Sequence, residues 1–185
     1  MKKFFVVLVF VGLLAFPLSV QAAQDDYPKA EVFGGYQFLR LGGSGGINTN
    51  GWNASLTGNF NKSLGVTADF GGAYKTVNVG GVNVSTKLYT YTGGPVVNLN
   101  SGGKVNPFVH ALFGGAHASG SASFGGSSGS ASINGFTMMF GGGVDAKVNS
   151  AIAVRVIQAD WAYFRFNGAS DSHNVRISTG IVFRF

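Results

Sequence analysis

Apolar and polar residues alternate through most of the chain, and the end of the sequence shows the pattern most clearly. From Val175 to Phe185, every second residue is Val, Ile, Thr or Phe. The opposite positions include Arg176, Ser178, Gly180 and Arg184. Because successive side chains of a strand point to opposite faces, this period of two predicts a β-strand with one apolar and one polar face.

Similar alternation predicts eight strands, separated by segments rich in Gly, Ser and Asn. The predicted strands are residues 30–41, 51–60, 64–74, 85–97, 105–117, 132–144, 151–166 and 175–185. Strands of about ten residues are long enough to cross a bilayer when they are tilted. The pairing of the last strand with the first would close such a set into a barrel.

The connecting segments alternate in length, which indicates the class of barrel. Short turns are predicted at residues 61–63, around NSGGK and around KVNS; the other connections are longer: GGSGGINTN, KTVNVGGVNV, ASGSASFGGSSGSA and NGASDSH. Outer-membrane barrels have short periplasmic turns and longer external loops. We therefore predict an all-β fold, a closed antiparallel eight-stranded transmembrane β-barrel of the outer-membrane type. The Gly- and Ser-rich stretch 118–131 is predicted to be a flexible loop.

The apolar faces of the predicted strands carry the larger side chains. In the second strand, Trp52, Leu56 and Phe60 share a face that is opposed by Asn53 and Thr57. Eight strands enclose an interior wide enough only for side chains, so the large apolar faces are predicted to meet lipid and the polar faces to line the interior. Aromatic residues near the strand ends fit two interfacial girdles, although ordinary sheet packing also favours them.

Composition and the first residues indicate an exported membrane protein. The chain has 45% hydrophobic and 11% charged residues, with 30 glycines and 17 phenylalanines among 185 residues. Lys2 and Lys3, an apolar run and small residues before Ala23 have the layout of a secretory signal peptide. An uncleaved membrane anchor is the alternative, which Pro17 disfavours because it interrupts the run. We expect a signal peptide at 1–22, a short periplasmic leader at 23–29 and an outer-membrane barrel at 30–185.

The charges, histidines and glycines do not indicate a nucleic-acid, metal or cofactor site. The formal net charge is +6, but the basic residues are spread singly, which argues against nucleic-acid binding. The chain has no Cys, so disulfides and thiolate ligands are excluded. His110 and His173 have no partner at ligand spacing, and the Gly-rich segments lack the strand–loop–helix setting of a phosphate loop. We expect no cofactor and no metal.

The inward face of the predicted barrel carries both acids and bases. Strand parity and one irregularity point eight charged or titratable residues inward: Glu31, Asp69, His110, Asp145, Arg155, Asp160, Arg176 and Arg184. Arg155 and Asp160 have opposite parity in one strand, which predicts a β-bulge near residues 157–158. Since buried charges must be paired or hydrogen-bonded, we expect a polar network that replaces an apolar core. A narrow gated ion path is the functional alternative.

Four stretches resemble the small eight-stranded outer-membrane barrels, the group of the OmpA transmembrane domain, OmpX-like and opacity-protein-like proteins: AEVFGGYQFLRL, PFVHALFGGAH, FGGGVDAKV and VRISTGIVFRF. The resemblance covers residues 27–185. It implies that Phe183 and Phe185 act as a recognition signal for the barrel-assembly machinery. OmpA continues into a peptidoglycan-binding domain, whereas this chain is expected to end at its barrel, so cell-wall anchoring is not carried over.

A His-x-Ser pair raises the question of catalysis. Some eight-stranded barrels act on lipid A, and one kind uses such a pair near the external rim with an acidic partner; here His117 and Ser119 stand at the end of the fifth strand. A hydrolytic Ser requires a base and a residue that orients the base. The acids Asp145 and Asp160 lie on other strands, and a Ser-rich segment produces such a match by chance. We expect no enzyme.

We therefore expect a monomeric integral protein of a Gram-negative outer membrane, with a structural or surface-interaction role such as envelope integrity or adhesion-like loop presentation. Expected partners are outer-membrane lipid, lipopolysaccharide, the barrel-assembly machinery and an unidentified extracellular ligand. A small-solute or ion pore is the main alternative. A lipid A-modifying enzyme and a periplasmic lipocalin-like binder are further alternatives.

Overall fold

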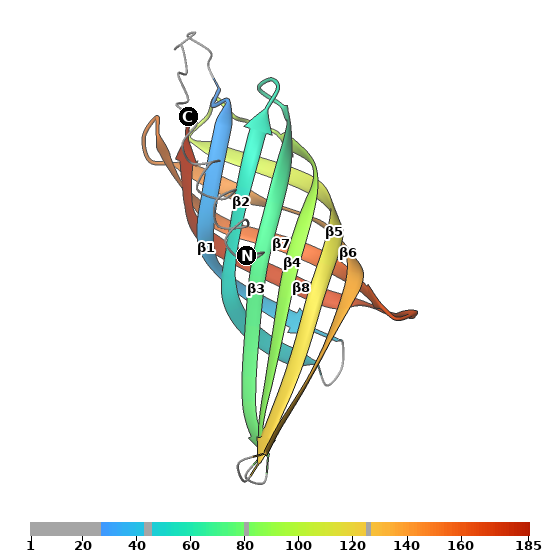
Figure 1. Cartoon of the computed structure of the whole chain (residues 1–185). Helices are drawn as coiled ribbons and strands as arrows, with labels where there is room; N and C mark the ends of the chain where they lie inside the picture. The colour runs from blue at the N-terminus through green and yellow to red at the C-terminus, as the bar shows by residue number, and fades with distance from the viewer. Residues whose placement is uncertain (1–26, 43–45, 80–81, 125–126) are drawn as a thin grey trace, which may run out of the picture.

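In the computed structural model, eight antiparallel strands form one closed barrel (Figure 1). The structure describes residues 27–42, 46–79, 82–124 and 127–185. The strands are β1 (Ala30–Leu41), β2 (Ile47–Asn59), β3 (Leu64–Val79), β4 (Val82–Asn98), β5 (Val105–Phe124), β6 (Ser127–Lys147), β7 (Ile152–Phe166) and β8 (Ala169–Arg184). The predicted fold class is confirmed. The predicted signal peptide, residues 1–22, and residues 23–26 of the predicted leader lie outside the described residues.

The barrel closes through the two ends of the strand series. β8 pairs antiparallel with β1 along most of its length, which confirms the predicted pairing of the last strand with the first. The backbone N–H of Phe185 donates to the carbonyl of Ala30 at 2.9 Å. The carbonyl of Phe185 accepts from the backbone N–H of Lys29 at 2.7 Å. These hydrogen bonds hold Phe185, the last residue of the sequence, in the barrel wall.

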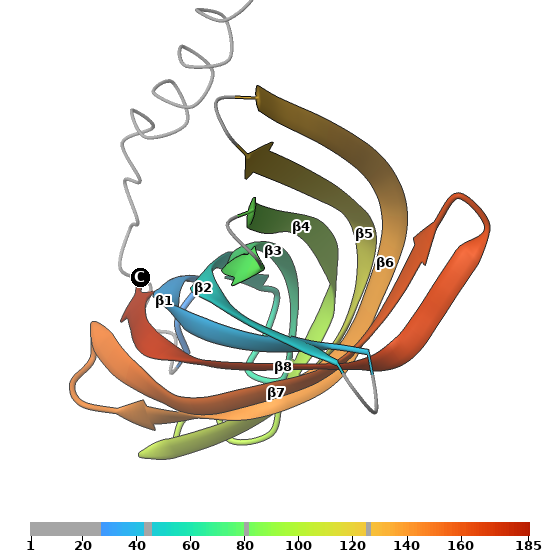
Figure 2. The ribbon, with the colours of Figure 1, turned by 90° about the horizontal axis from the view of Figure 1, so that it is seen from below.

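The two ends of the barrel differ in their connections. The end that carries Phe185, called the terminal end below, has turns at residues 60–63, 99–104 and 148–151. The other end, the hairpin end, carries the hairpins that join β1 to β2, β3 to β4, β5 to β6 and β7 to β8. Here β3, β4, β5 and β6 continue together, and they form the tip at the bottom of Figure 1 and the near end in Figure 2.

Strands at the hairpin end are longer than predicted. Most of the stretch 118–131, predicted to be a flexible loop, is paired strand, because β5 and β6 remain in register as far as Phe124 and Ser127. That prediction is therefore wrong. Strand pairing is made by backbone N–H and C=O groups, which small Ser, Gly and Ala side chains leave accessible to a neighbouring strand. β8 likewise begins at Ala169, within a segment predicted to be a loop.

A tight turn joins β7 to β8, and it supplies a test of the fold. Asn167 and Gly168 have φ angles of 45° and 86°. Positive φ at both central residues is the requirement of a type I′ turn, for which Asn-Gly is a preferred sequence. We expect Gly168→Ala to lower the free energy of unfolding by about 1 kcal/mol, because a Cβ is disfavoured at this φ.

Urea unfolding in detergent micelles, followed by Trp fluorescence, measures this loss. Gly34→Ala is the matched control, since a Cβ at Gly34 meets no atom within 4 Å and its φ is not positive. Equal unfolding midpoints for the two variants would contradict the role of the turn.

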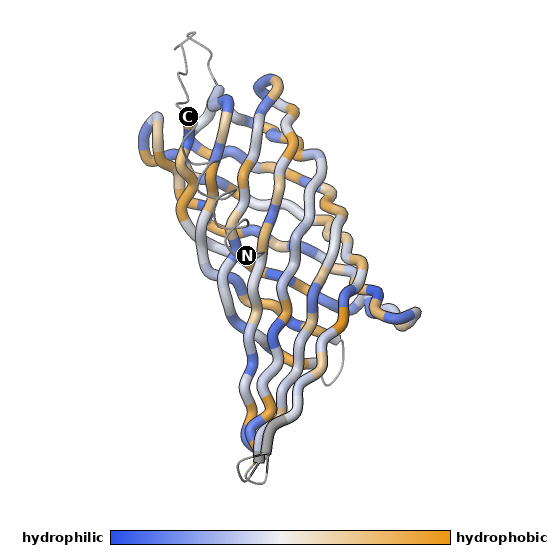
Figure 3. The backbone as a smooth tube through the Cα atoms, viewed as in Figure 1, coloured by the Kyte–Doolittle hydropathy of each residue, from blue (hydrophilic) through white to orange (hydrophobic). Residues whose placement is uncertain are grey.

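Large apolar side chains cover the outside of the barrel. Phe70, Phe113, Phe140 and Ile181 are all more than 40% exposed. Figure 3 shows orange and blue alternating along the strands, as expected where successive residues face outward and inward. No helix among the described residues is long and apolar enough to span a membrane.

Aromatic residues toward the hairpin end contact one another on the outer wall. Nε1 of Trp52 donates to the hydroxyl of Tyr74 at 3.0 Å, and the ring of Tyr74 meets that of Tyr89 edge-on with centroids 5.8 Å apart. The hydroxyl of Tyr36 donates to Oδ1 of Asn50 at 2.5 Å. Such rings have an apolar body and a polar tip, which suits the boundary between lipid and water.

Candidate functional site

The barrel interior is the candidate functional site, because it gathers the eight charged or titratable side chains that the sequence analysis singled out. Each is no more than 9% exposed: Glu31, Asp69, His110, Asp145, Arg155, Asp160, Arg176 and Arg184. The bulge predicted near residues 157–158 is present, since β7 and β8 shift register between Arg155 and Gln158. Val156 and Ile157 are both exposed there, so the shift lets Arg155 and Asp160 face inward together.

Asp160 lies at the centre of a group of ion pairs. Its Oδ2 accepts from Nε of Arg176 at 2.7 Å, and its Oδ1 lies 2.7 Å from Nε2 of His110. Nη1 of Arg176 also donates to Oδ1 of Asp69 at 2.6 Å. Asn53 donates to the other oxygen of Asp69 at 3.0 Å. These residues come from β2, β3, β5, β7 and β8, so the network joins strands that are not neighbours in the wall.

Arg155 is held by hydrogen bonds and by aromatic rings. Its Nε and Nη2 donate to the two oxygens of Asp145 at 2.8 and 3.0 Å, and its Nη1 donates to Oε1 of Gln158 at 2.7 Å. Its guanidinium lies 4.4 and 4.3 Å from the ring centroids of Phe33 and Phe108. A planar guanidinium can make paired hydrogen bonds to a carboxylate and also stack on aromatic rings. A lysine would keep the charge and lose the paired hydrogen bonds.

Toward the terminal end, the interior contains one more ion pair and a small apolar cluster. Nε of Arg184 lies 2.9 Å from Oε1 of Glu31. Phe33 packs nearby with buried Ala153 and Val182. A glycine in β6 makes room for a neighbouring ring, since a Cβ at Gly143 would lie 2.8 Å from Cζ of Phe108. The glycines of FGGG in β6 are therefore close-packing positions.

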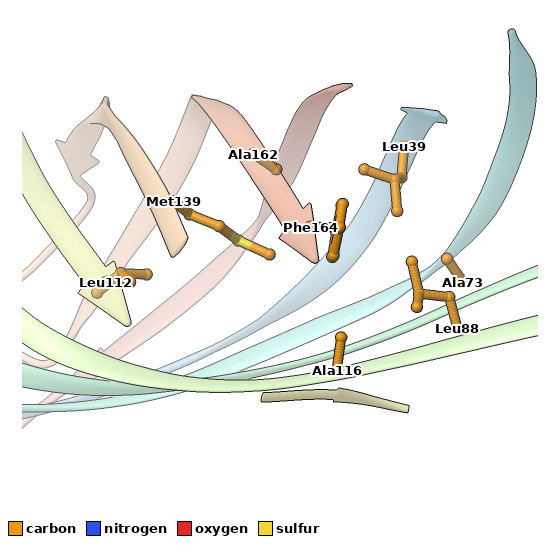
Figure 4. Packing of buried hydrophobic residues seen from close by; sticks show 8 residues of the cluster. All are labelled: Leu39, Ala73, Leu88, Leu112, Ala116, Met139, Ala162 and Phe164. Carbon is orange, nitrogen blue, oxygen red and sulfur yellow. The ribbon is translucent and has the colours of Figure 1, made fainter. Parts of the chain in front are cut away.

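Toward the hairpin end the interior contains a cluster of apolar side chains among buried polar ones such as Thr49 and Asn174, and the sequence analysis did not predict this cluster. The cluster, called the apolar layer below, is made of Leu39, Ala73, Leu88, Leu112, Ala116, Met139, Ala162 and Phe164 (Figure 4). The expectation that polar groups replace an apolar core throughout is therefore wrong. The buried polar side chains beside it have backbone partners, since Thr49 donates to the carbonyl of Leu39 at 2.9 Å and Asn174 to that of Ala162 at 3.1 Å. The apolar residues pack without such partners. The structure thus places the apolar layer on the hairpin-end side of the ion pairs.

A small cavity remains among the ion-paired residues of the interior. Its lining includes Asp69, Asn98, His110, Asp145 and Gln158. The apolar layer lies between this cavity and the hairpin end, because its members follow the cavity residues along the strands in that direction. The cavity and the apolar layer therefore occupy different heights in the barrel.

The His-x-Ser pair is not joined to the acids considered as its partners. Nδ1 of His117 lies 2.7 Å from Oδ1 of Asn134 on the outward face of β5 and β6. Asp145 and Asp160 point into the interior, where they pair with arginines. The barrel wall separates the two sets. Within the described part of the chain, no three His, Asp or Glu residues are placed to hold a metal ion.

The aromatic residues assigned to assembly lie on the opposite side of the wall from the ion pairs. Phe183 and Phe185 point outward at the terminal end and are 47% and 53% exposed. Neither ring fills the interior. Sequence reasoning missed Gln158 and Asn53 as members of the polar network, and the only signal for them is their inward position on strands that also carry acids.

Comparison with known proteins assigns the family. A model of the outer membrane protein beta-barrel domain matches residues 8–185. The structure resembles Ail, the attachment invasion locus protein of Yersinia pestis, solved with the heparin analogue sucrose octasulfate (TM-score 0.66, 21% identity, 86% of this chain and 99% of that chain). It also resembles Neisserial surface protein A (TM-score 0.59, 16% identity, 85% of this chain and 97% of that chain). A further similar structure is the N-terminal barrel of OprF from Pseudomonas aeruginosa (TM-score 0.52, 12% identity, 86% of this chain and 99% of that chain). No curated protein matches the sequence. The chain belongs to the family of outer-membrane β-barrel domains.

Proposed function

We propose that this outer-membrane barrel has a surface-interaction role, with its hairpin end facing the cell exterior. The observation that carries the proposal is a reversal of polarity along the outer wall. Outward positions are apolar as far as Tyr74 and Tyr89, and beyond them they carry Thr76, Ser85 and other polar residues. A wall that is apolar across the lipid and polar beyond it fits hairpins that stand in water.

The cations at the hairpin end support contact with anionic lipid. Lys87 lies across from Tyr74, and Arg165 lies across from Phe136; both are exposed on the outward face. Cations beside interfacial aromatics are placed to meet lipid phosphates, so we include lipopolysaccharide among the partners. The sulfated sugar bound to Ail supports a polyanion as the class of extracellular ligand.

The proposal includes the route to the membrane. Residues 1–22 direct export as a signal peptide, and Phe183 and Phe185 are the signal for the barrel-assembly machinery. The exposed positions of both rings leave them accessible to a partner before the wall meets lipid. We expect the barrel to act as a monomer, and the closed wall supports this because it needs no strand from a second copy.

Single-cysteine labelling tests the location and orientation, since the chain has no Cys of its own. We expect Ser121→Cys, on the β5–β6 hairpin, to react with a membrane-impermeant maleimide on intact cells. Asn61→Cys, in a terminal-end turn, should react only after the outer membrane is permeabilised. The protein should fractionate with the outer membrane and shift on gels when heated. The opposite labelling pattern, or a detergent-independent periplasmic protein, would overturn the proposal.

Planar-bilayer recordings test the structural role against the pore alternative. We expect the purified protein to show no steady conductance, because ions would lose their water on entering the apolar layer around Leu112 and Met139. A sample prepared from cells without the protein reports contaminating porins. Steady, large conductance that depends on the protein would contradict a closed interior.

A further inference from the structure

Two lysines lie side by side where β5 and β6 reach the terminal end. The register places Val105 across from Ala146, and the N–H of Lys147 donates to the carbonyl of Lys104 at 2.8 Å. Lys104 and Lys147 are therefore directly opposite each other on neighbouring strands. Like charges in this arrangement destabilise a sheet, and an anion held between them removes that cost.

The acid nearest to this pair in the sequence is already engaged. Asp145, two residues before Lys147, accepts from Nε and Nη2 of Arg155 at 2.8 and 3.0 Å. Both lysines are exposed, and within the described part of the chain neither has an ion-pair partner. Further exposed cations lie at the same end: Lys29 and Lys62. The rim of the terminal end is thus cationic, and an anion finds two adjacent ammonium groups at Lys104 and Lys147.

Apolar side chains on the outer wall reach the same level as these lysines. Val105 and Val148, which follow the two lysines directly in the sequence, are 49% and 65% exposed. The most exposed large apolar residues among those described are the first residues of the three terminal-end turns: Phe60, Leu99 and Val148. Lipid acyl chains cover such residues in a membrane wall, and a lysine places its charge at the end of a flexible apolar stem. The two ammonium groups therefore lie where the acyl chains give way to lipid headgroups.

The turn after Lys147 holds this part of the rim in place. Oδ1 of Asn149 accepts from the N–H groups of Ala151 and Ile152 at 2.9 and 2.8 Å. The N–H of Val148 donates to the carbonyl of Ile152 at 2.9 Å. The backbone beside Lys147 is thus preorganised, which lowers the entropic cost of binding a ligand there.

We propose that Lys104 and Lys147 bind the phosphate of an anionic phospholipid of the phosphatidylglycerol class, with its acyl chains against Val105 and Val148. This goes beyond the surface role, because the site lies at the opposite end of the barrel, in the leaflet that borders the periplasm in the proposed orientation. Two ammonium groups donate to the oxygens of one phosphodiester. Phosphatidylethanolamine carries the same phosphate together with an ammonium group of its own, which the lysines repel, so the site selects the anionic headgroup. A glycan strand of the cell wall would leave the apolar residues uncovered, so lipid fits the rim better.

The test uses the whole chain in phosphatidylcholine nanodiscs that contain a small fraction of phosphatidylglycerol or phosphatidylethanolamine. Each of these two lipids carries the same fluorescent acceptor on an acyl chain. A donor dye on Ser150→Cys, in the turn after Lys147, reports the lipid beside the site by energy transfer. We expect phosphatidylglycerol to be enriched there at least about fivefold over phosphatidylethanolamine. The double variant Lys104→Gln, Lys147→Gln should abolish this enrichment. The charge-preserving control Lys104→Arg, Lys147→Arg should keep it, as should Lys75→Gln at the hairpin end.

Each result supports or overturns the lipid site. Equal energy transfer to the two lipids in the wild type, or enrichment that persists in Lys104→Gln, Lys147→Gln, overturns it. An excess of inorganic phosphate at constant ionic strength should leave the enrichment unchanged; displacement would make free phosphate the ligand and overturn the lipid assignment. Retention by purified peptidoglycan through the same lysines, without a lipid preference, would make the cell wall the occupant and also overturn the proposal.

Discussion

Replacing Arg176 with methionine is expected to lower the free energy of unfolding by about 3–5 kcal/mol. Arg176 is 1% exposed and pairs with Asp69 at 2.6 Å and with Asp160 at 2.7 Å. Methionine fills much of the same space but leaves two buried carboxylates without the cation between them. Urea unfolding in detergent micelles measures the change, and the temperature at which the folded band converts on a gel provides a second readout.

Two further variants separate the ion pairs from general effects of losing an arginine. Arg165→Met removes an exposed arginine and should change the free energy of unfolding by less than about 0.5 kcal/mol. Adding Asp69→Asn and Asp160→Asn to Arg176→Met should recover part of the loss, because the uncompensated charges are gone. The same unfolding midpoint for Arg176→Met and Arg165→Met would show that the interior ion pairs do not stabilise the barrel.

Phe185→Ala is expected to leave most of the protein outside the outer membrane of living cells while barely changing refolding into detergent micelles. The Phe185 ring is 53% exposed and packs against no interior group, so its contribution to the folded state is small. Its role is instead proposed to be recognition by the assembly machinery. Fractionation, gel shift on heating and in vitro refolding yield measure the two effects separately.

Deletion of Phe185 tests the role of its backbone, which the substitution by alanine leaves in place. The deletion also removes backbone hydrogen bonds to Lys29 and Ala30, of 2.7, 3.1 and 2.9 Å, that close β8 onto β1. It should therefore reduce refolding in vitro as well as insertion in cells. Normal insertion of Phe185→Ala would reject the recognition signal, and normal refolding of the deletion would reject the closing role of its backbone.

The alternation of apolar and polar residues was sufficient to predict the fold, because a strand has only two faces. A slip of one residue would exchange every lipid-facing and interior side chain, so the pattern around Trp52 and around Ile181 determines orientation locally. The same logic predicted the bulge in β7, since Arg155 and Asp160 cannot both face inward without an extra residue. Strand ends were predicted less well, because Ser and Gly composition says little about whether two backbones pair.

The apolar layer was missed for a different reason. Leu39, Leu112 and Met139 are single apolar residues at inward positions of different strands, and none of them forms a local pattern. Register brings them together: Leu112 lies across from Met139, and Met139 lies across from Ala162. A layer of this kind depends on the relative height of all eight strands, which no window of sequence contains.

By itself, the sequence determined the strand number, the closed antiparallel wall, the outward apolar face and the set of charges that face inward. These follow from a period of two and from the small interior of an eight-stranded barrel. Only the tertiary structure decided which charges pair, that Asp160 lies between Arg176 and His110, and that β7 pairs with β6 only from Gly135. Those features depend on strand register and stagger around the closed wall, because each joins residues that are distant in the chain.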